Sequence, residues 1–262
     1  MQYVEVKIHE GVATIIMSRS QVCNALHPQM LEELATAFSD VHQEKKVQAV
    51  VFSGSGSHFC SGMDLNTLRA ISELEPNDAL PQWYRIWERL SELYEAMLRF
   101  PKPVVAAIDG GAIGAGLGLA LASDLIVCSE SAFFSAPAIN LGLVAGSTAA
   151  LLDFRFGSAV AAQLLLTGNP LDSKQAFHLG LTSEPIASDQ IWVRAHALAS
   201  QCAKAPREAQ QATKRILNEG VGESLFTLLA SGAAQSAAAC TTDAATEGIL
   251  AFLEKREPQW PA

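Results

Sequence analysis

The chain has 262 residues, 49% hydrophobic and 17% charged, which is enough for one large domain or for a core with an appended module. Its net charge of −9 argues against a nucleic-acid partner, because binding to phosphate backbones needs a basic surface. The five cysteines are scattered without C-x-x-C spacing and the six histidines form no H-x-x-x-H pair, so neither disulfides nor a metal site is expected. No charge-free apolar stretch of about eighteen residues occurs and no leader pattern opens the chain; we expect no membrane span and a cytoplasmic location.

The chain begins with alternating strand and helix patterns and ends in helices. The expected strands are Tyr3–Ile8, Val12–Ser18, Val47–Phe52, Val104–Ile108 and Leu125–Cys128. A helix opens at Pro28, a long one covers Ala79–Phe100, and a small-residue helix follows the turn Asp109–Gly118. Further helices are expected at about 146–167, 172–179, 190–204, 206–217, 222–236 and 241–255. This order predicts an α/β core at 1–195 and a helical C-terminal region at 196–262.

Two glycine-rich turns hold most of the chemical information. Phe59–Leu65 and Asp109–Gly118 each follow a buried strand, and the second leads directly into a helix. Glycine allows positive φ and a close approach of a ligand to the backbone, and the first N–H groups of a helix have no internal partner. Two such turns could aim two N–H donors at one oxygen, an oxyanion hole worth about 3–4 kcal/mol per donor. The alternative is that the turns only let helices pack closely on a sheet.

Other glycine motifs fit this sequence less well. The dinucleotide pattern G-x-G-x-x-G would need glycine at position 119, where the chain has Leu119. The chain also lacks the G-K-[ST] phosphate loop and the G-x-S-x-G nucleophile elbow. A nucleotide-dependent oxidoreductase is therefore disfavoured.

Nine short segments carry a family resemblance when they are taken in order: Asn24–Leu26, Phe59–Leu65, Pro101–Gly110, Gly114–Gly116, Leu121–Leu125, Phe134–Gly142, Leu166–Gly168, Ala176–Leu181 and Glu247–Arg256. Together they resemble the enoyl-CoA hydratase/isomerase (crotonase) superfamily over almost the whole chain. Thr246–Trp260 and the glutamate-poor site look most like the enoyl-CoA hydratase domain-containing proteins. The resemblance implies a crotonase-like spiral of ββα units with a helical C-terminal trimerisation region, assembled as a homotrimer or a dimer of trimers.

The same resemblance implies an acyl-CoA ligand, with coenzyme A as part of the substrate and no separate cofactor or metal. It places the two oxyanion N–H donors at Met63 and Ala115. The implied contacts to coenzyme A are Ala25, Leu26, Ser61, Asp64, Leu65, Phe252 and Lys255, the last two approaching from a neighbouring subunit. The implied acyl pocket consists of Trp83, Trp87, Gly118, Ala138 and Asn140, with ordinary core packing as the alternative for the tryptophans.

The sequence departs from the family pattern at both catalytic glutamates. The matching positions are Gly118 and Ala138, and neither residue can supply the base for water or the acid for Cα that hydration requires. We therefore expect no efficient hydration; isomerisation, decarboxylation and thioester hydrolysis stay open, with a catalytically silent acyl-CoA binder as the alternative. The two small residues predict room for a bulkier acyl group unless the helix 79–100 fills it. Asn140, the polar side chain nearest to Ala138, could bind water or substrate.

None of the remaining polar residues is assigned as the acid or the base. Asp64, Ser147 and Thr148 lie at expected helix starts, where capping is the usual role of such side chains. His58 and Cys60 together suggest a Cys/His nucleophile, but in the family pattern Cys60 points into packing. The catalytic group thus stays open at this stage.

Overall fold

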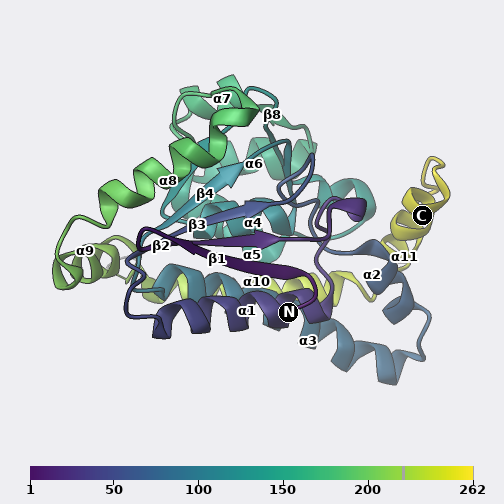
Figure 1. The fold of residues 1–262 in the computed structure, drawn as a ribbon. Coiled ribbons are helices and arrows are strands. Elements are labelled where there is room, and N and C mark those ends of the chain that lie inside the picture. Colours follow the sequence, from purple (N-terminus) through teal and green to yellow (C-terminus); the bar gives the residue numbers. More distant parts are fainter. Residues whose placement is uncertain (220–221, 262) are drawn as a thin grey trace.

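The computed structural model describes residues 1–219 and 222–261 and places a five-stranded sheet at the centre of the chain (Figure 1). Its strands are β1 (Val4–His9), β2 (Val12–Met17), β3 (Ala49–Gly54), β4 (Val104–Ile108) and β6 (Leu125–Cys128), in the order β1-β2-β3-β4-β6. β1 and β2 form an antiparallel hairpin, and the other neighbours are parallel. Glu10 and Gly11 both adopt positive φ in the hairpin turn, as two-residue turns require. All five predicted strands are confirmed.

A second, smaller sheet lies beside the glycine-rich turns. It contains β5 (Gly111–Ile113), β7 (Phe133–Ser135) and β8 (Leu171–Asp172), with β5 parallel to β7 and β7 antiparallel to β8. Strands of two or three residues are too short to show a hydrophobic period, so the sequence pattern did not reveal β5, β7 or β8. This sheet is what places the second glycine-rich turn.

Helices cover both sheets, and their bounds agree with the sequence pattern to within three residues except at one point. The expected helix at 146–167 is divided, because Gly157 adopts φ +77° and interrupts it. The α/β class is confirmed. The helices are α1 (Pro28–Gln43), α2 (Leu65–Ser72), α3 (Pro76–Arg99), α4 (Ala115–Ala122), α5 (Gly146–Phe156), α6 (Ser158–Thr167), α7 (Ser173–His178), α8 (Ile191–Cys202), α9 (Arg207–Glu219), α10 (Gly222–Ala239) and α11 (Asp243–Glu254).

Both faces of the central strands β2, β3 and β4 are buried, whereas β1 at the edge is mostly exposed. In β3, Val50 and Phe52 face the main core with α1 and α3, whereas Val51 faces α8, because successive side chains of a strand point to opposite sides. Figure 1 shows α8 on one side of the sheet and α1 on the other. Residue 195, the expected boundary, lies inside α8, where Ala195 is fully buried against the sheet.

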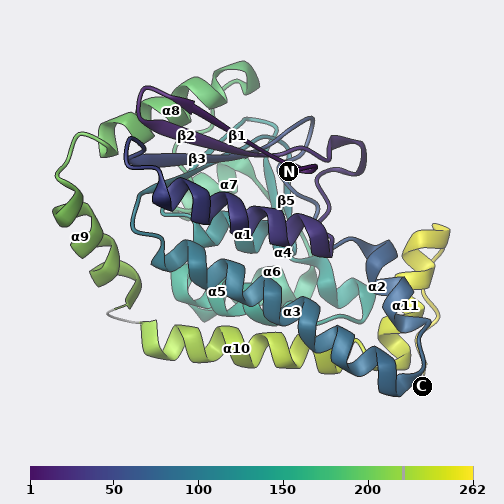
Figure 2. The ribbon, with the colours of Figure 1, turned by 60° about the horizontal axis from the view of Figure 1, so that its bottom comes forward.

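The last two helices, α10 and α11, pack against the core of their own chain. α10 lies along α3 and α5 (Figure 2). α11 contacts α2 and the 3₁₀ helix Pro137–Leu141, so closely that a Cβ on Gly248 would lie 2.3 Å from the Leu141 carbonyl oxygen.

No helix among residues 1–219 and 222–261 has the length and apolar character needed to cross a membrane.

One buried ion pair fastens α9 to the edge of the sheet. Asp124 Oδ2 accepts hydrogen bonds from the Val104 N–H, at 2.8 Å, and from Lys214 Nζ, at 2.7 Å. Lys214 is 7% exposed and also donates to the Lys102 carbonyl. Burial lowers the pKa of Lys214, and Asp124 opposes this effect. The carboxylate therefore compensates a charge that has little access to water.

Asp124→Ala is expected to lower the free energy of unfolding by about 3–5 kcal/mol, because it leaves a buried ammonium group and a strand N–H without their partner. Urea denaturation measures this change. The control is Asp40→Ala at an exposed position, with an expected change below about 0.5 kcal/mol. Equal stability of the two variants would contradict the role given to the ion pair.

Candidate active site

An apolar cavity of about 290 Å³ opens between the two glycine-rich turns. Its lining contains no Asp, Glu, His, Lys, Arg, Cys or Tyr side chain from the described part of the chain. The cavity therefore offers hydrophobic surface and backbone, with a few hydroxyl groups. The lining residues are Ser61, Gly62, Met63, Leu65, Leu68, Trp87, Leu90, Ile113, Gly114, Ala115, Pro137, Ala138, Leu141, Leu143, Val144, Ala145, Gly146, Ser147, Thr148, Ser236 and Phe252.

The first turn is held by short backbone hydrogen bonds to the loop before α1. The Leu26 N–H donates to the Gly62 carbonyl and the Asp64 N–H donates to the Leu26 carbonyl, both at 2.8 Å. These two bonds leave the intervening Met63 N–H directed away from Leu26, as in any parallel bridge. Gly62 has φ +92°, a conformation that glycine adopts without strain.

The second turn lies against the first. The Ile113 N–H donates to the Cys60 carbonyl at 2.9 Å, and a Cβ on Gly62 would lie 3.3 Å from the Ala115 nitrogen. Gly114 has φ +53°, and α4 begins at the next residue. The Ala115 N–H is consequently the first amide of a helix, at its positive end.

The amides of Met63 and Ala115 are the two donors that the resemblance indicates, and both residues line the cavity. Neither N–H has a hydrogen-bond acceptor among the described residues. Buried backbone N–H groups are almost always paired, so two free donors beside one cavity need an explanation. Polar atoms in the cavity, from a ligand or from water, would supply the missing acceptors.

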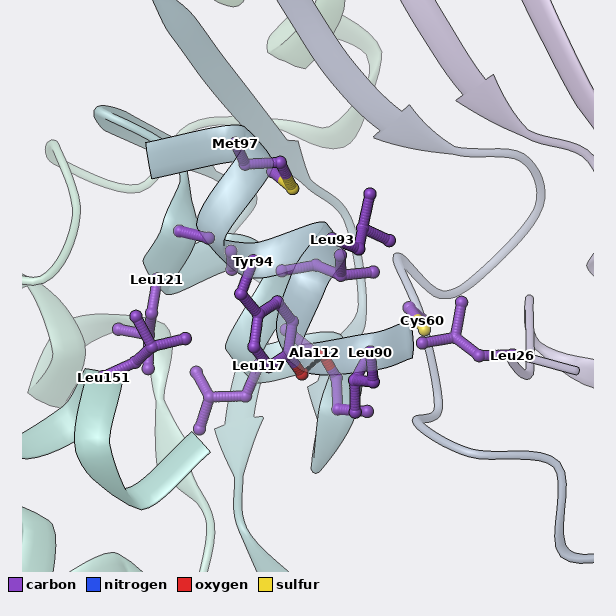
Figure 3. Close-up of a cluster of buried hydrophobic side chains, with 14 of the residues drawn as sticks. Leu26, Cys60, Leu90, Leu93, Tyr94, Met97, Ala112, Leu117, Leu121 and Leu151 are labelled. Carbon is purple, nitrogen blue, oxygen red and sulfur yellow. Dashed lines mark hydrogen bonds between the residues drawn. The ribbon is translucent and has the colours of Figure 1, made fainter. Parts of the chain in front are cut away.

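Gly118, the first glutamate position, does not widen the cavity. A Cβ at this position would lie 2.2 Å from the Tyr94 hydroxyl oxygen. Tyr94 comes from α3 and is completely buried; Figure 3 shows its ring among Leu90, Leu117 and Leu121. Gly118 is absent from the lining, so the expected extra room is filled here by the long helix, the alternative that the sequence left open.

The other expected acyl-pocket residues separate into two groups. Trp87 and Ala138 line the cavity, and the Trp87 indole N–H donates to Sγ of Cys240, the residue after α10, at 3.4 Å. Trp83 is buried in the core away from the lining, which matches the packing alternative. Asn140 is also absent from the lining; it is exposed, and its amide faces Gly168.

Most residues expected to contact coenzyme A lie around the first turn, and some of them already form hydrogen bonds within the chain. Asp64 caps α2 as expected, accepting from the Asn66 N–H at 2.9 Å, and its other oxygen accepts from Arg19 at 2.6 Å. Arg19 also donates to the Ala25 carbonyl. Leu26 is fully buried. The backbone N–H groups of Ala25, Leu26 and Asp64 are hydrogen-bonded within the chain as well, and a contact of these residues with coenzyme A stays a prediction.

Ser61, Leu65 and Phe252 line the cavity, and Lys255 lies exposed at the end of α11 in a left-handed conformation. Phe252 was expected to reach a neighbouring subunit. The structure places it at the cavity of its own chain, where α11 packs on α2 and Pro137–Leu141, and its contact with a neighbouring subunit stays a prediction.

Ser147 and Thr148 do not cap α5, contrary to the sequence-based expectation. Ser147 Oγ donates to the Leu229 carbonyl, and Thr148 Oγ1 donates to the Gly114 carbonyl. The cap comes from α10, where Ser236 Oγ accepts from the Gly146 N–H at 3.0 Å. A hydroxyl from a distant helix cannot be assigned to this role from local sequence.

Cys60 is a packed thiol, as the resemblance implies. It is fully buried, it donates to the Asn24 carbonyl, and burial raises its pKa to about 12. His58 contacts the Ser57 hydroxyl and Phe133 instead. Since only a thiolate is nucleophilic, the pair supplies no nucleophile. The described residues also contain no cluster of three metal-binding side chains.

The sequence of the chain is similar to a known protein family and to several known relatives. The family model described as enoyl-CoA hydratase/isomerase matches residues 7–262. The 2,3-dehydroadipyl-CoA hydratase of Escherichia coli K12 is 34% identical over 259 residues, covering 96% of this chain and 95% of that protein. The mitochondrial enoyl-CoA hydratase domain-containing protein 3 of Danio rerio is 32% identical over 250 residues, covering 95% and 84%.

The fold of the chain also matches the folds of solved crystal structures. An enoyl-CoA hydratase/isomerase from Xanthobacter autotrophicus Py2 superposes with a TM-score of 0.88 at 24% sequence identity, covering 99% of each chain. This likeness, together with the C-terminal helices, confirms the crotonase-like architecture expected from the sequence.

Gly118→Ala is expected to lower the free energy of unfolding by about 1–3 kcal/mol, because the new methyl group overlaps the Tyr94 hydroxyl in a closely packed core. In a Tyr94→Leu protein, Gly118→Ala should lower the free energy of unfolding by a smaller amount. The difference between the two values is the coupling free energy, which should be about 1 kcal/mol or more. Denaturant midpoints of the four proteins measure this cycle. Additive effects would show that Tyr94 does not occupy this space.

Proposed function

The chain belongs to the enoyl-CoA hydratase/isomerase family, and on that premise we propose that it binds an acyl-CoA thioester, with the acyl group in the apolar cavity and the thioester oxygen between the N–H groups of Met63 and Ala115. One observation carries the proposal. Two neighbouring backbone donors without acceptors open on a cavity that is otherwise hydrophobic. Such donors stabilise negative charge that develops on an oxygen.

The cavity suits reactions in which the substrate supplies its own electrons. Hydration needs a protein base and acid within hydrogen-bond reach, and no carboxylate, imidazole, amine, thiol or phenol of the described residues lines the cavity. In decarboxylation the bond between Cα and the carboxylate breaks, its electron pair forms the enolate, CO₂ leaves, and water returns a proton to Cα. Decarboxylation of a malonyl-type thioester is thus the reaction that this site supports best.

A catalytically silent acyl-CoA binder is the second candidate. The absence of any titratable side chain from the described lining favours it, whereas the two free amides suit a site that stabilises charge. The two candidates share the binding step and differ only in whether a product forms.

The binding step predicts that affinity rises with acyl chain length. Each buried methylene contributes about 0.8 kcal/mol, so hexanoyl-CoA should bind about 15-fold more tightly than butyryl-CoA. Isothermal titration calorimetry measures both affinities. Adipoyl-CoA is the matched control: it has the same chain length with a terminal carboxylate, and should bind more weakly than hexanoyl-CoA because no cationic side chain of the described residues lines the cavity. Affinity independent of chain length would contradict acyl binding there.

Mass spectrometry of the same protein with a panel of thioesters separates the two candidates. The panel contains crotonyl-CoA, malonyl-CoA and methylmalonyl-CoA. Loss of CO₂ from a malonyl-type thioester would support the enzyme, and binding without any product would support the silent binder. Hydration of crotonyl-CoA at about 10 s⁻¹, a typical enzyme rate, would overturn the argument from the missing carboxylates.

We further propose that the chain assembles as a homotrimer or a dimer of trimers. On α9, Ile216 is 72% exposed and Leu217 is 65% exposed, and Leu217 lies beside a surface hollow that Leu125 and Leu198 also line. Exposed apolar patches of this kind mark interaction sites. Light scattering should give the mass of three or six chains, and Ile216→Glu combined with Leu217→Glu should lower it. A single-chain mass for the unmodified protein would refute the assembly.

A further inference from the structure

Two hydroxyl groups lie behind the second glycine-rich turn, on the carbonyl side of the peptides that flank Ala115. Tyr94 Oη of α3 donates to the Ala115 carbonyl at 2.8 Å, and Thr148 Oγ1 of α5 donates to the Gly114 carbonyl at 3.3 Å. The Gly114 carbonyl also accepts from the Gly118 N–H within α4. Both side chains are almost inaccessible, with Tyr94 0% and Thr148 3% exposed, so bulk water does not compete for these bonds.

The Gly114 carbonyl and the Ala115 N–H belong to one peptide group. A hydrogen bond accepted by the carbonyl polarises the whole group, and the N–H at its other end becomes a stronger donor. This effect is larger in a buried setting than in water. Thr148, which also lines the cavity, therefore bonds to the carbonyl end of the peptide group that carries one of the two free amides.

The two hydroxyls also fix where that amide points. α4 contributes the amide, whereas the hydroxyls come from α3 and α5, which pack against α4 from outside. Tyr94 is itself enclosed by leucines, as Figure 3 shows, so its hydroxyl has a defined position. Stabilisation by an oxyanion hole depends on donors placed in advance, because no reorganisation is then needed during the reaction.

We propose that Thr148 and Tyr94 are positioning residues that orient and polarise the peptide groups flanking Ala115, and thereby strengthen the Ala115 N–H as a donor to the thioester oxygen. The inference rests on the proposed function. Thr148 has the larger effect, because it bonds to the same peptide group as the Ala115 N–H, and Tyr94 acts on the next one.

The test measures polarisation of a bound thioester directly. Cinnamoyl-CoA absorbs at longer wavelength when its carbonyl accepts strong hydrogen bonds, so its red shift on binding reports the strength of the donors. We expect a clear red shift with the unmodified protein. Thr148→Val, which keeps the shape of this cavity-lining residue and removes its hydroxyl, should lose at least half of that shift when the protein is saturated with the thioester. Thr148→Ser should restore the shift.

Two further variants keep the test independent of folding defects. Tyr94→Phe retains the ring and should lose a smaller part of the shift. Ser123→Ala is the matched control, since Ser123 is a buried residue whose hydroxyl donates to the Leu119 carbonyl near the other end of α4, and its removal should leave the shift unchanged.

The outcomes separate the two proposals. A red shift that is the same in the unmodified protein, Thr148→Val and Tyr94→Phe would overturn the positioning role and leave the oxyanion hole standing. An equal loss in Ser123→Ala would also overturn it, because any loosening of α4 would then suffice. Binding of cinnamoyl-CoA without a red shift in the unmodified protein would overturn both this inference and the proposed function.

Discussion

The site depends on the close approach of two glycine-containing turns. A Cβ on Gly62 would lie 2.8 Å from the Ile113 carbonyl oxygen, and a Cβ on Gly116 would lie 2.3 Å from the Cys60 carbonyl oxygen. A side chain at either glycine would push the turns apart, because the obstacle is backbone that belongs to a sheet. The amides of Met63 and Ala115 stay adjacent only while both contacts are preserved, and every proposed step depends on that adjacency.

Backbone N–H groups can keep their positions when the side chains around them change. Gly118 and Ala138 cannot act as acid or base, yet the free N–H groups remain. The space at Gly118 is taken by a buried phenol that bonds to the adjacent turn. Tyr94 therefore supports the donor peptides from behind, where it has no access to the cavity and cannot itself exchange protons with a ligand. The described lining of the cavity thus offers a ligand backbone amides, hydroxyl groups and apolar surface.

Periodic patterns predicted most of the fold, and the exceptions have local causes. The strands at Val104–Ile108 and Leu125–Cys128 were evident because both faces of the sheet are covered, which requires continuous apolar runs. The division between α5 and α6 was missed because Gly157 lies between two apolar helical segments, and a single glycine is also compatible with a continuous helix. β5 and β8 have too few residues to show any period.

The sequence by itself determined the two turns, the cap that Asp64 gives to α2, and the small residues Gly118 and Ala138, because each of these depends on residue type at a fixed place in the chain. Only the tertiary structure decided that Tyr94 fills the space beside Gly118, that Asn140 faces away from the cavity, and that Thr148 reaches the Gly114 carbonyl. Such contacts join residues far apart in sequence. They follow from how helices pack against one another, and local periodicity contains no information about that packing.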